Sequence, residues 1–471
     1  MTRKLVLLPV VFIFFVLCGC ALAPKYTKPA SPVPAQWPQS SVYQETVTGA
    51  PAVMAPELPW REFIADEKLQ KIIETSLKNN RDLRVAALNV ERARAYYGIS
   101  RAELLPSVNA AGSMYKERMP GDLSSTGSAM TTEKYNVNLG ISSWEIDLFG
   151  RIRSLKDRAL EQYLATQEAH RGAQISLISA VAQAYLMLAA DRENLKTAIS
   201  TFETQEAIYK LMRKRYDAGI VSELDVKRAQ SQVEAARGDV ARYKQLTAQD
   251  ENFLNLLTGH TIEQELLPHD LTSVGTPKDF SPGLSSAVLL FRPDILAAEH
   301  QLKAANANIG AARAAFFPRI ALTTTIGTAS AELSGLFKAG QDTWNFAPQI
   351  IMPIFDLRTW SAYDVTKAEK EISVAQYEKT IQTAFREVAD ALAEKSMVDQ
   401  RISAQQSLVD AIAETYRLSN ARYTKGIDSY LSVLDAQRTL YGAQQDLTML
   451  RLAKINNQIV LYKTLGGGKD N

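Results

Sequence analysis

Few side chains in this sequence of 471 residues have the types and spacing that catalysis or metal binding requires. The four histidines lie far apart in the sequence and lack the spacing of metal ligands. They are His170, His260, His269 and His300. The sequence also lacks a phosphate-binding loop, a cofactor motif and a nucleophile motif of the Ser-His-Asp type. We therefore predict that the protein is not an enzyme and that it needs neither a metal nor a cofactor.

We expect a covalent modification of the chain within its first twenty residues. A short positive region precedes an apolar run, Leu5–Leu17, which is typical of a secretory signal. The run ends close to Cys18 and Cys20, and the segment resembles a bacterial lipobox, where the signal is cut before a cysteine that then carries lipid. We predict lipidation of Cys20; an ordinary signal peptide cut after a small residue is the alternative. Because both cysteines lie in this segment, we expect no disulfide bond in the mature chain.

Two glycines, Gly219 and Gly426, mark expected turns between long helices, because glycine readily takes the left-handed conformation that ends a helix. Soon after the second turn, Leu431 and Asp435 lie one helical turn apart and therefore on the same face. In an assembly with three-fold symmetry, each residue would form a ring. A ring of leucines blocks water, and a ring of aspartates forms a cation-selective constriction. We therefore predict that Leu431 and Asp435 form a gate.

Charged and aromatic residues beside the turns could tie one hairpin to its neighbour. Arg422 and Tyr423 come just before the second turn. Asp217 and Asp225 flank the first turn. We predict that contacts between these two sets lock the gate, and that breaking them lets the hairpin tips separate. An alternative for Asp225 is that it only caps the helix that begins after Ser222.

Very long helices must position these turns. The segment from about 150 to 218 contains no proline and little glycine, and the segment from about 357 to 425 contains neither. Each helix would be on the order of 100 Å long. Alanine is frequent among the leucines and isoleucines, and small residues allow close helix packing, as in a coiled coil. We expect two long hairpins, arranged either as a solid coiled-coil rod or as part of a hollow ring.

The sequence also repeats itself. The stretch from Asp82 to Pro106 is echoed by the stretch from Asp294 to Pro318, and Arg215–Gly219 is echoed by Arg422–Gly426. Each repeat contains a helix that ends near a proline, two strand-like segments and two very long helices. The predicted segments are a lipoprotein signal peptide (1–19), a lipidated extended leader (20–59), the first repeat (60–265), a linker (266–284), the second repeat (285–464) and a disordered tail (465–471).

Four segments alternate apolar with polar or small side chains, which is the pattern of strands with two different faces. They are about 106–118, 133–146, 318–328 and 342–354. Each is long enough to cross a bilayer as a tilted strand, whereas a soluble sheet on the helices is the alternative. Because exposed strand edges are not tolerated in lipid and four strands cannot close a barrel, several copies must combine. A dimer and a trimer both satisfy this count, and a trimer leaves the wider lumen.

Charge and hydropathy narrow the possible functions further. The 53 basic and 51 acidic side chains nearly balance, with a net charge of +2, so we predict no nucleic-acid binding. After the N-terminus, no segment approaches the roughly 18 consecutive apolar residues of a membrane-spanning helix. If the mature chain crosses a membrane, we expect it to do so as a closed β-barrel.

Three motifs carry a family resemblance that covers nearly the whole mature chain. They are Arg292–Ile295, Arg313–Pro318 and Tyr423–Arg438. On these motifs the sequence resembles the outer-membrane factors of the TolC type, in particular the lipoprotein branch that includes OprM and the NodT-like proteins. The resemblance implies a mostly α chain with transmembrane β-strands. Three chains would close a twelve-stranded β-barrel that continues into an α-helical barrel in the periplasm, with an equatorial region around it.

The same resemblance implies a function and partners. It implies an outer-membrane channel of a tripartite efflux pump, which passively conducts drugs or other small molecules. The implied partners are two further copies of the chain, a periplasmic adaptor protein, an inner-membrane transporter of the resistance-nodulation-division class and outer-membrane lipid. Leu431 and Asp435 match family positions that line the constriction, and Arg422 with Tyr423 matches positions that lock it. Two alternatives stay open: an exit duct for type I protein secretion and a non-conducting coiled-coil scaffold lipoprotein.

Overall fold

The computed structural model describes residues 22–38, 55–280 and 285–467. The predicted signal peptide, Cys20 and the later part of the leader lie outside these residues. Contacts divide the chain into two compact units, and each unit takes segments from both sequence repeats. Unit 1 comprises Met1–Ala30, Asn89–Gln167 and Ala297–Tyr377; unit 2 comprises Ser31–Leu88, Glu168–Leu296 and Glu378–Asn471.

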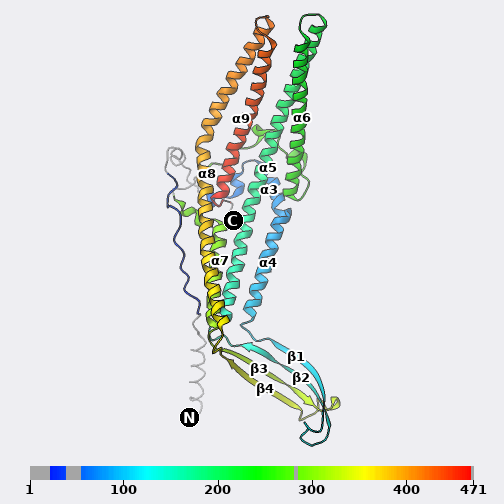
Figure 1. Cartoon of the computed structure of the whole chain (residues 1–471), viewed down its shortest axis with the longest axis vertical. Helices are drawn as coiled ribbons and strands as arrows, with labels where there is room; N and C mark the ends of the chain where they lie inside the picture. The colour runs from blue at the N-terminus through cyan, green and yellow to red at the C-terminus, as the bar shows by residue number, and fades with distance from the viewer. Residues whose placement is uncertain (1–21, 39–54, 281–284, 468–471) are drawn as a thin grey trace. The chain divides into compact units, whose positions relative to one another are not determined.

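Unit 1 contains a four-stranded antiparallel sheet in the order β1-β2-β3-β4 (Figure 1). The strands are β1 (Val108–Met119), β2 (Met130–Glu145), β3 (Arg319–Ser330) and β4 (Asp342–Ile351). Strands β1 and β2 form one antiparallel pair, β3 and β4 form another, and the pairing of β2 with β3 joins the two repeats. The prediction of four strands, two from each repeat, is confirmed.

The central strands β2 and β3 approach closely beside a bulge. The register shifts between Ile141 and Trp144, where Ser143 has a φ of 55°. A bulge bends its strand and increases the local twist. Next to it, a Cβ atom on Gly140 would lie 2.2 Å from the carbonyl oxygen of Thr324, so only glycine fits there.

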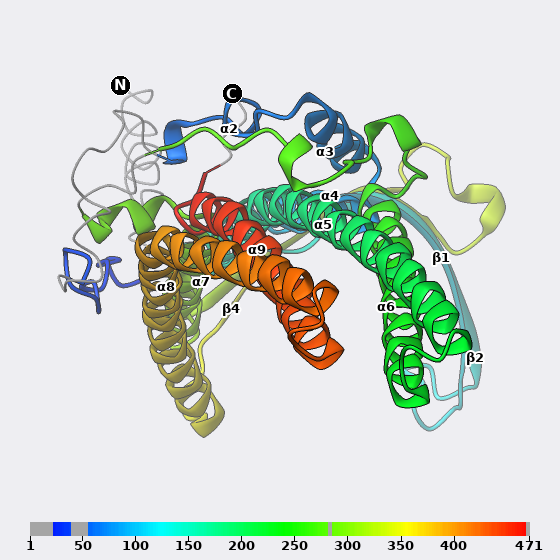
Figure 2. The same ribbon diagram turned by 90° about the horizontal axis from the view of Figure 1, so that it is seen from above.

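Long helices supply most of the chain, as predicted. They are α4 (Arg81–Ala102), α5 (Arg151–Asp217), α6 (Glu223–Thr258), α7 (Pro293–Ala314), α8 (Leu357–Thr424) and α9 (Tyr430–Thr464). The short elements are η2 (Ala55–Glu57), α2 (Trp60–Phe63), α3 (Glu67–Asn79), η3 (Gln264–Leu266), η4 (Leu271–Ser273), η5 (Ser286–Phe291) and η6 (Leu333–Gly335). Helix α6 lies beside α5 and α9 lies beside α8, which gives two hairpins (Figures 1 and 2). Helices α5 and α8 have 67 and 68 residues.

Local sequence signals explain where several helices begin and end. The side chain of Asp66 accepts a hydrogen bond from the backbone N–H of Leu69 at 2.9 Å and so caps the start of α3. Helix α6 ends at Gly259, which has a φ of 63°. Helix α5 contains an apolar window of 18 residues with a mean hydropathy of 1.5, and 67% of that window is buried, as in a core helix.

The end of α9 completes an aromatic core in unit 2. The rings of Phe63 and Tyr462 stack with 4.0 Å between their centroids. Leu465 is fully buried, and a Cβ atom on Gly467 would lie 2.4 Å from the Tyr462 ring. The predicted disordered tail is therefore wrong for its first three residues, because they pack against this core. The last four residues of the chain lie outside the described part.

Candidate functional site at the hairpin tips

A glycine with positive φ follows the first helix of each hairpin. Gly219 and Gly426 have φ values of 72° and 73°, the left-handed conformation that favours glycine. After Gly219, the backbone N–H of Ile220 donates to the carbonyl oxygen of Arg215 at 2.8 Å. A Cβ atom on either glycine would meet nothing within 4 Å. The backbone conformation, rather than the available space, therefore requires glycine at both tips.

The two predicted acids at the first tip have partners within their own hairpin. Asp225 forms a capping box with Ser222, whose hydroxyl donates to the Asp225 carboxylate at 2.7 Å. Arg228 lies 3.8 Å from the same carboxylate. Asp217 is exposed and lies 3.7 Å from Arg213. Among the described residues of one chain, no hydrogen bond or ion pair joins either acid to the second hairpin, so the predicted lock between copies remains a prediction.

Arg422 pairs with an acid that belongs to its own turn. Its Nε donates to Asp428 at 2.5 Å and its Nη2 donates to the other carboxylate oxygen at 3.0 Å. Such a bidentate pair fixes the geometry of the turn. Hydrogen bonds from the Arg422 guanidinium also hold the pKa of Asp428 below its usual value. Within one chain, the partner of Arg422 is thus Asp428, rather than Asp217 or Asp225.

Tyr423 joins the two hairpins of one chain. Arg215, near the end of α5, donates to the Tyr423 hydroxyl at 3.2 Å, and its guanidinium carbon lies 5.8 Å from the ring centroid. The hydroxyl itself points to the sulfur of Met212 at 3.5 Å. Sequence reasoning did not single out Arg215; the repeat indicated only that Arg215 and Arg422 occupy equivalent positions near the two turns.

An apolar cluster surrounds the Tyr423 contact. It contains the buried residues Met212, Val226, Ala229, Tyr430, Val433 and Leu434. Residues of both hairpins contribute, so the cluster packs α5 and α6 against the start of α9. The hydroxyl of Tyr430 is buried and has no hydrogen-bond partner among the described residues. Burial raises the pKa of this phenol above its usual value.

The two predicted gate residues lie on an exposed face of α9 and not in this cluster. Leu431 is 52% exposed, and the side chain of Asp435 is 68% exposed. Arg438, one turn further, lies 3.1 Å from Asp435 and is exposed as well. Helix α9 thus buries one face against its own chain. A second face, which carries Leu431 and Asp435, stays exposed. Residues on this face are available to line a channel or to meet a neighbouring copy.

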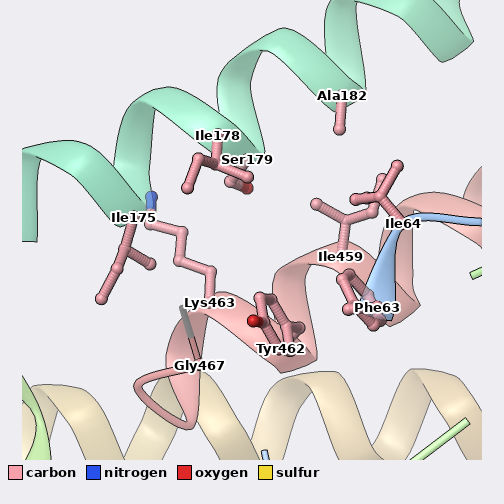
Figure 3. Close-up of a pocket in the computed structure, with 10 residues that line it drawn as sticks. All are labelled: Phe63, Ile64, Ile175, Ile178, Ser179, Ala182, Ile459, Tyr462, Lys463 and Gly467. Carbon is pink, nitrogen blue, oxygen red and sulfur yellow. The ribbon is translucent and has the colours of Figure 1, made fainter. Parts of the chain in front are cut away.

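A pocket in unit 2 is too small to hold a substrate. Its lining is mainly apolar and includes Phe63, Ile178 and Tyr462 (Figure 3). The space open to the centre of a water-sized sphere is ≈ 10 Å³, which is about the room that a single water needs. Within the described residues, no group of three or more His, Cys, Asp or Glu side chains could hold a metal ion.

Comparison with known proteins identifies the family. Residues 72–260 and 284–467 match the outer membrane efflux proteins. The chain belongs to this family. The toluene efflux pump outer membrane protein TtgC of Pseudomonas putida is 47% identical over 469 residues, which cover 99% of this chain and 96% of TtgC.

Solved structures of channels share the fold. One is CusC, whose crystal structures concern folding and transmembrane channel formation. It is 40% identical and superposes with a TM-score of 0.84, over 95% of this chain and 100% of CusC. The open state of the Neisseria gonorrhoeae outer membrane channel MtrE is 36% identical, with a TM-score of 0.85 over 95% of this chain and 98% of MtrE. The predicted fold, the outer-membrane location and the role as outer-membrane channel of an efflux pump are confirmed.

Proposed function

We propose that three copies of this chain close a twelve-stranded barrel and passively conduct small organic molecules out of the cell. The observation that carries this proposal is the pair of exposed edge strands. All ten residues of β4 are exposed, and so are eleven of the twelve residues of β1. Unpaired strand edges are not tolerated in lipid. Pairing of β4 in one copy with β1 in the next satisfies both edges.

The width of the lumen favours three copies over two. Side chains largely fill a barrel of eight strands, whereas a barrel of twelve leaves an open passage. Two copies would supply eight strands and three would supply twelve. A channel that passes drug-sized molecules therefore requires the trimer.

The helices next to the sheet edges support the same pairing. Helix α4 leads into β1, and β4 leads into α8, so pairing of these strands brings α4 of one copy towards α8 of the next. Tyr96 and Ile99 are exposed on α4. Val365 and Ile372 are exposed on α8 and, seven residues apart, lie on one face. Contact between copies would bury these apolar side chains.

We propose that a lipid on Cys20 anchors the chain and that the leader holds the anchor in place. Glu299 on α7 contacts the leader through two side chains, with Lys28 Nζ at 2.7 Å and the Tyr26 hydroxyl at 3.4 Å. Lys303 lies 3.1 Å from the same carboxylate. Burial raises the pKa of Glu299, and hydrogen bonds from the two lysines outweigh this effect, so the pKa lies below its usual value.

The proposed partners act at the hairpin tips. A periplasmic adaptor protein binds there and connects the channel to an inner-membrane transporter of the resistance-nodulation-division class, which supplies the energy. The adaptor opens the channel if it binds the open state more tightly than the closed state. Leu431 and Asp435 form the constriction of the closed state. The name of TtgC, a toluene efflux pump protein, supports small apolar organic molecules as the substrate class.

Purified lipidated protein tests the proposal in two steps. Native mass spectrometry should show a trimer, and planar bilayers should show unitary currents. The Asp435→Ala variant should raise the conductance of the closed state, because it removes a side chain from the constriction, while Asp410→Ala, which removes an exposed acid on α8, should not. Absence of unitary current would favour a scaffold protein, and unchanged conductance in Asp435→Ala would remove this residue from the gate. In cells, loss of protein secretion rather than of solvent resistance on deletion would favour type I secretion.

A further inference from the structure

The start of helix α8 in unit 1 carries side chains of steadily increasing polarity. Ile354 and Phe355, just before the helix, are 88% and 83% exposed. Trp360 is exposed one turn into the helix, and Tyr363 and Lys367 follow on the same face. Apolar, then aromatic, then cationic side chains in this order are typical of the interface between a bilayer and water.

An aromatic cluster with two cations lies on this face. The ring of Phe316 on α7 contacts Trp360 edge-on, with 4.8 Å between the centroids, and Tyr363 at 6.0 Å. The ammonium group of Lys367 lies 4.8 Å from the centroid of the Tyr363 ring, and the guanidinium of Arg313 lies 5.9 Å from it. The end of α7 and the start of α8 thus bring two positive charges to one tyrosine.

The positive charge of this cluster is only partly compensated. Arg313 donates to the carbonyl oxygen of Leu22 at 3.3 Å and to the Tyr363 hydroxyl at 3.4 Å. It has no carboxylate partner among the described residues, and a guanidinium has five N–H donors, so donors remain for a ligand. Lys367 pairs with Asp364 at 2.7 Å, and both side chains are more than half exposed. The cluster therefore contains two cations but only one paired carboxylate, that of Asp364.

The leader runs towards this cluster from the side away from the sheet. Tyr26 contacts Glu299 on α7, and the carbonyl oxygen of Pro24 accepts a hydrogen bond from Asn306, two turns closer to the end of α7. Leu22 then contacts Arg313, close to the point where α7 leads into β3. Leu22 is the second residue after Cys20 in the sequence. The described part of the leader thus follows α7 towards the point at which β3 begins.

We propose that Arg313 and Lys367 bind the phosphodiester group of an anionic phospholipid in the periplasmic leaflet of the outer membrane. Arginine can bind a phosphate through two parallel hydrogen bonds, and lysine acts as a point charge. Tyr363 holds both cations, while Trp360 and Phe355 lie against the lipid chains. The proposal rests on the proposed membrane level of the sheet, and it adds a lipid-binding site that is separate from the covalent anchor.

Retained lipids can be counted on the assembled protein. The full-length lipidated protein is equilibrated in micelles that contain equal amounts of phosphatidylglycerol and phosphatidylethanolamine, and native mass spectrometry then identifies the lipids that stay bound. One basic side chain near an anionic phosphate gives a preference of about five-fold. We expect wild-type protein to retain phosphatidylglycerol preferentially, Lys367→Gln to lose about five-fold of that preference, and Lys367→Gln with Arg313→Gln to lose it entirely.

Matched variants separate this site from general charge effects. Lys379→Gln removes an exposed lysine further along α8 and should retain wild-type preference. Equal retention of both lipids by wild-type protein, or an equal loss in Lys379→Gln and Lys367→Gln, would overturn the proposal. Displacement of the lipid by inorganic phosphate would assign the site to a free anion instead. Conductance is measured on the same samples, so failure of the lipid site and failure of the proposed channel give different results.

Discussion

Removal of one hydroxyl tests whether the Tyr423 contact keeps the hairpin tips together. The Tyr423→Phe variant keeps the ring in the apolar cluster but loses the hydrogen bond from Arg215, which is 3.2 Å long. A hydrogen bond to a charged group contributes about 1.5–3 kcal/mol. Arg215 is only partly buried, which favours the lower end of this range. We therefore expect roughly a ten-fold increase in the ratio of open to closed channels, equivalent to about 1.4 kcal/mol.

Single-channel recording in planar bilayers measures this ratio directly. Arg215→Gln alone should have a similar effect, and the double variant should add little, because each change removes the same bond. Lys210→Gln is the matched control, since Lys210 is exposed on the same helix and pairs with Glu206 one turn away, outside the proposed gate. Fully additive effects, with a coupling energy under about 0.5 kcal/mol, would refute the role of this bond in closing the channel.

Four further predictions concern stability and gating. Tyr430→Phe should raise stability by about 1 kcal/mol in thermal unfolding, because it removes a buried hydroxyl without a partner in the described chain. Gly426→Ala should lower stability by about 1 kcal/mol, owing to its positive φ, whereas Gly442→Ala within α9, where a Cβ atom has open space, should raise it. Burial and the neighbouring carboxylate of Asp191 raise the pKa of Asp250 to about 7, so stability should fall as the pH rises from about 4 to 7 and then level off. Asp250→Asn should make this fall smaller, while the pKa of Asp191, which burial also raises, leaves a part of it. Raising the salt concentration should lower the open probability of wild-type channels and leave Asp435→Ala unchanged.

The long elements of the fold could be predicted from sequence because their signals are local and long. The absence of proline from the segments that became α5 and α8 predicted both helices close to their observed ends. The alternation of side chains predicted the four strands, with ends within a few residues. The packing of residues 465–467 could not be predicted from local signals, because Leu465 is buried in a core that segments distant in the sequence form.

The contacts at the tips were harder to predict, because each charged side chain has several possible partners in the sequence. Only the three-dimensional structure decides which of them it contacts. Arg422 and Asp428 are six residues apart and meet only because the turn at Gly426 reverses the chain. Arg215 and Arg422 occupy equivalent positions of the repeat. Arg215 nevertheless contacts the other hairpin, whereas Arg422 pairs with an acid of its own turn. Equivalent positions in a repeat therefore predict location better than they predict partners.

The contacts within one chain should respond weakly to salt. The Arg422–Asp428 pair is exposed and joins two residues of the same turn, so separation of the hairpins leaves it intact. At the tips, the described contacts between the hairpins are the Arg215–Tyr423 hydrogen bond and the apolar cluster. The ion pair of Arg451 on α9 with Glu193 on α5, at 3.9 Å, lies away from the tips. Neither contact at the tips depends mainly on attraction between opposite charges. A strong effect of salt on gating must therefore arise from contacts between copies.

The sign of the salt effect then identifies which charges control the gate. A ring of Asp435 side chains repels itself, and salt screens that repulsion, since the Debye length falls from about 10 Å at 0.1 M to about 3 Å at 1 M. Salt would then favour the closed state. Locks between copies through Asp217 or Asp225 would weaken in salt and give the opposite sign. Both of these acids already lie within 4 Å of an arginine in their own chain, which reduces their attraction to a neighbour. Asp435 also lies 3.1 Å from Arg438, but three-fold symmetry would bring three copies of Asp435 together at the axis. We therefore expect repulsion in the Asp435 ring to dominate and salt to close the channel.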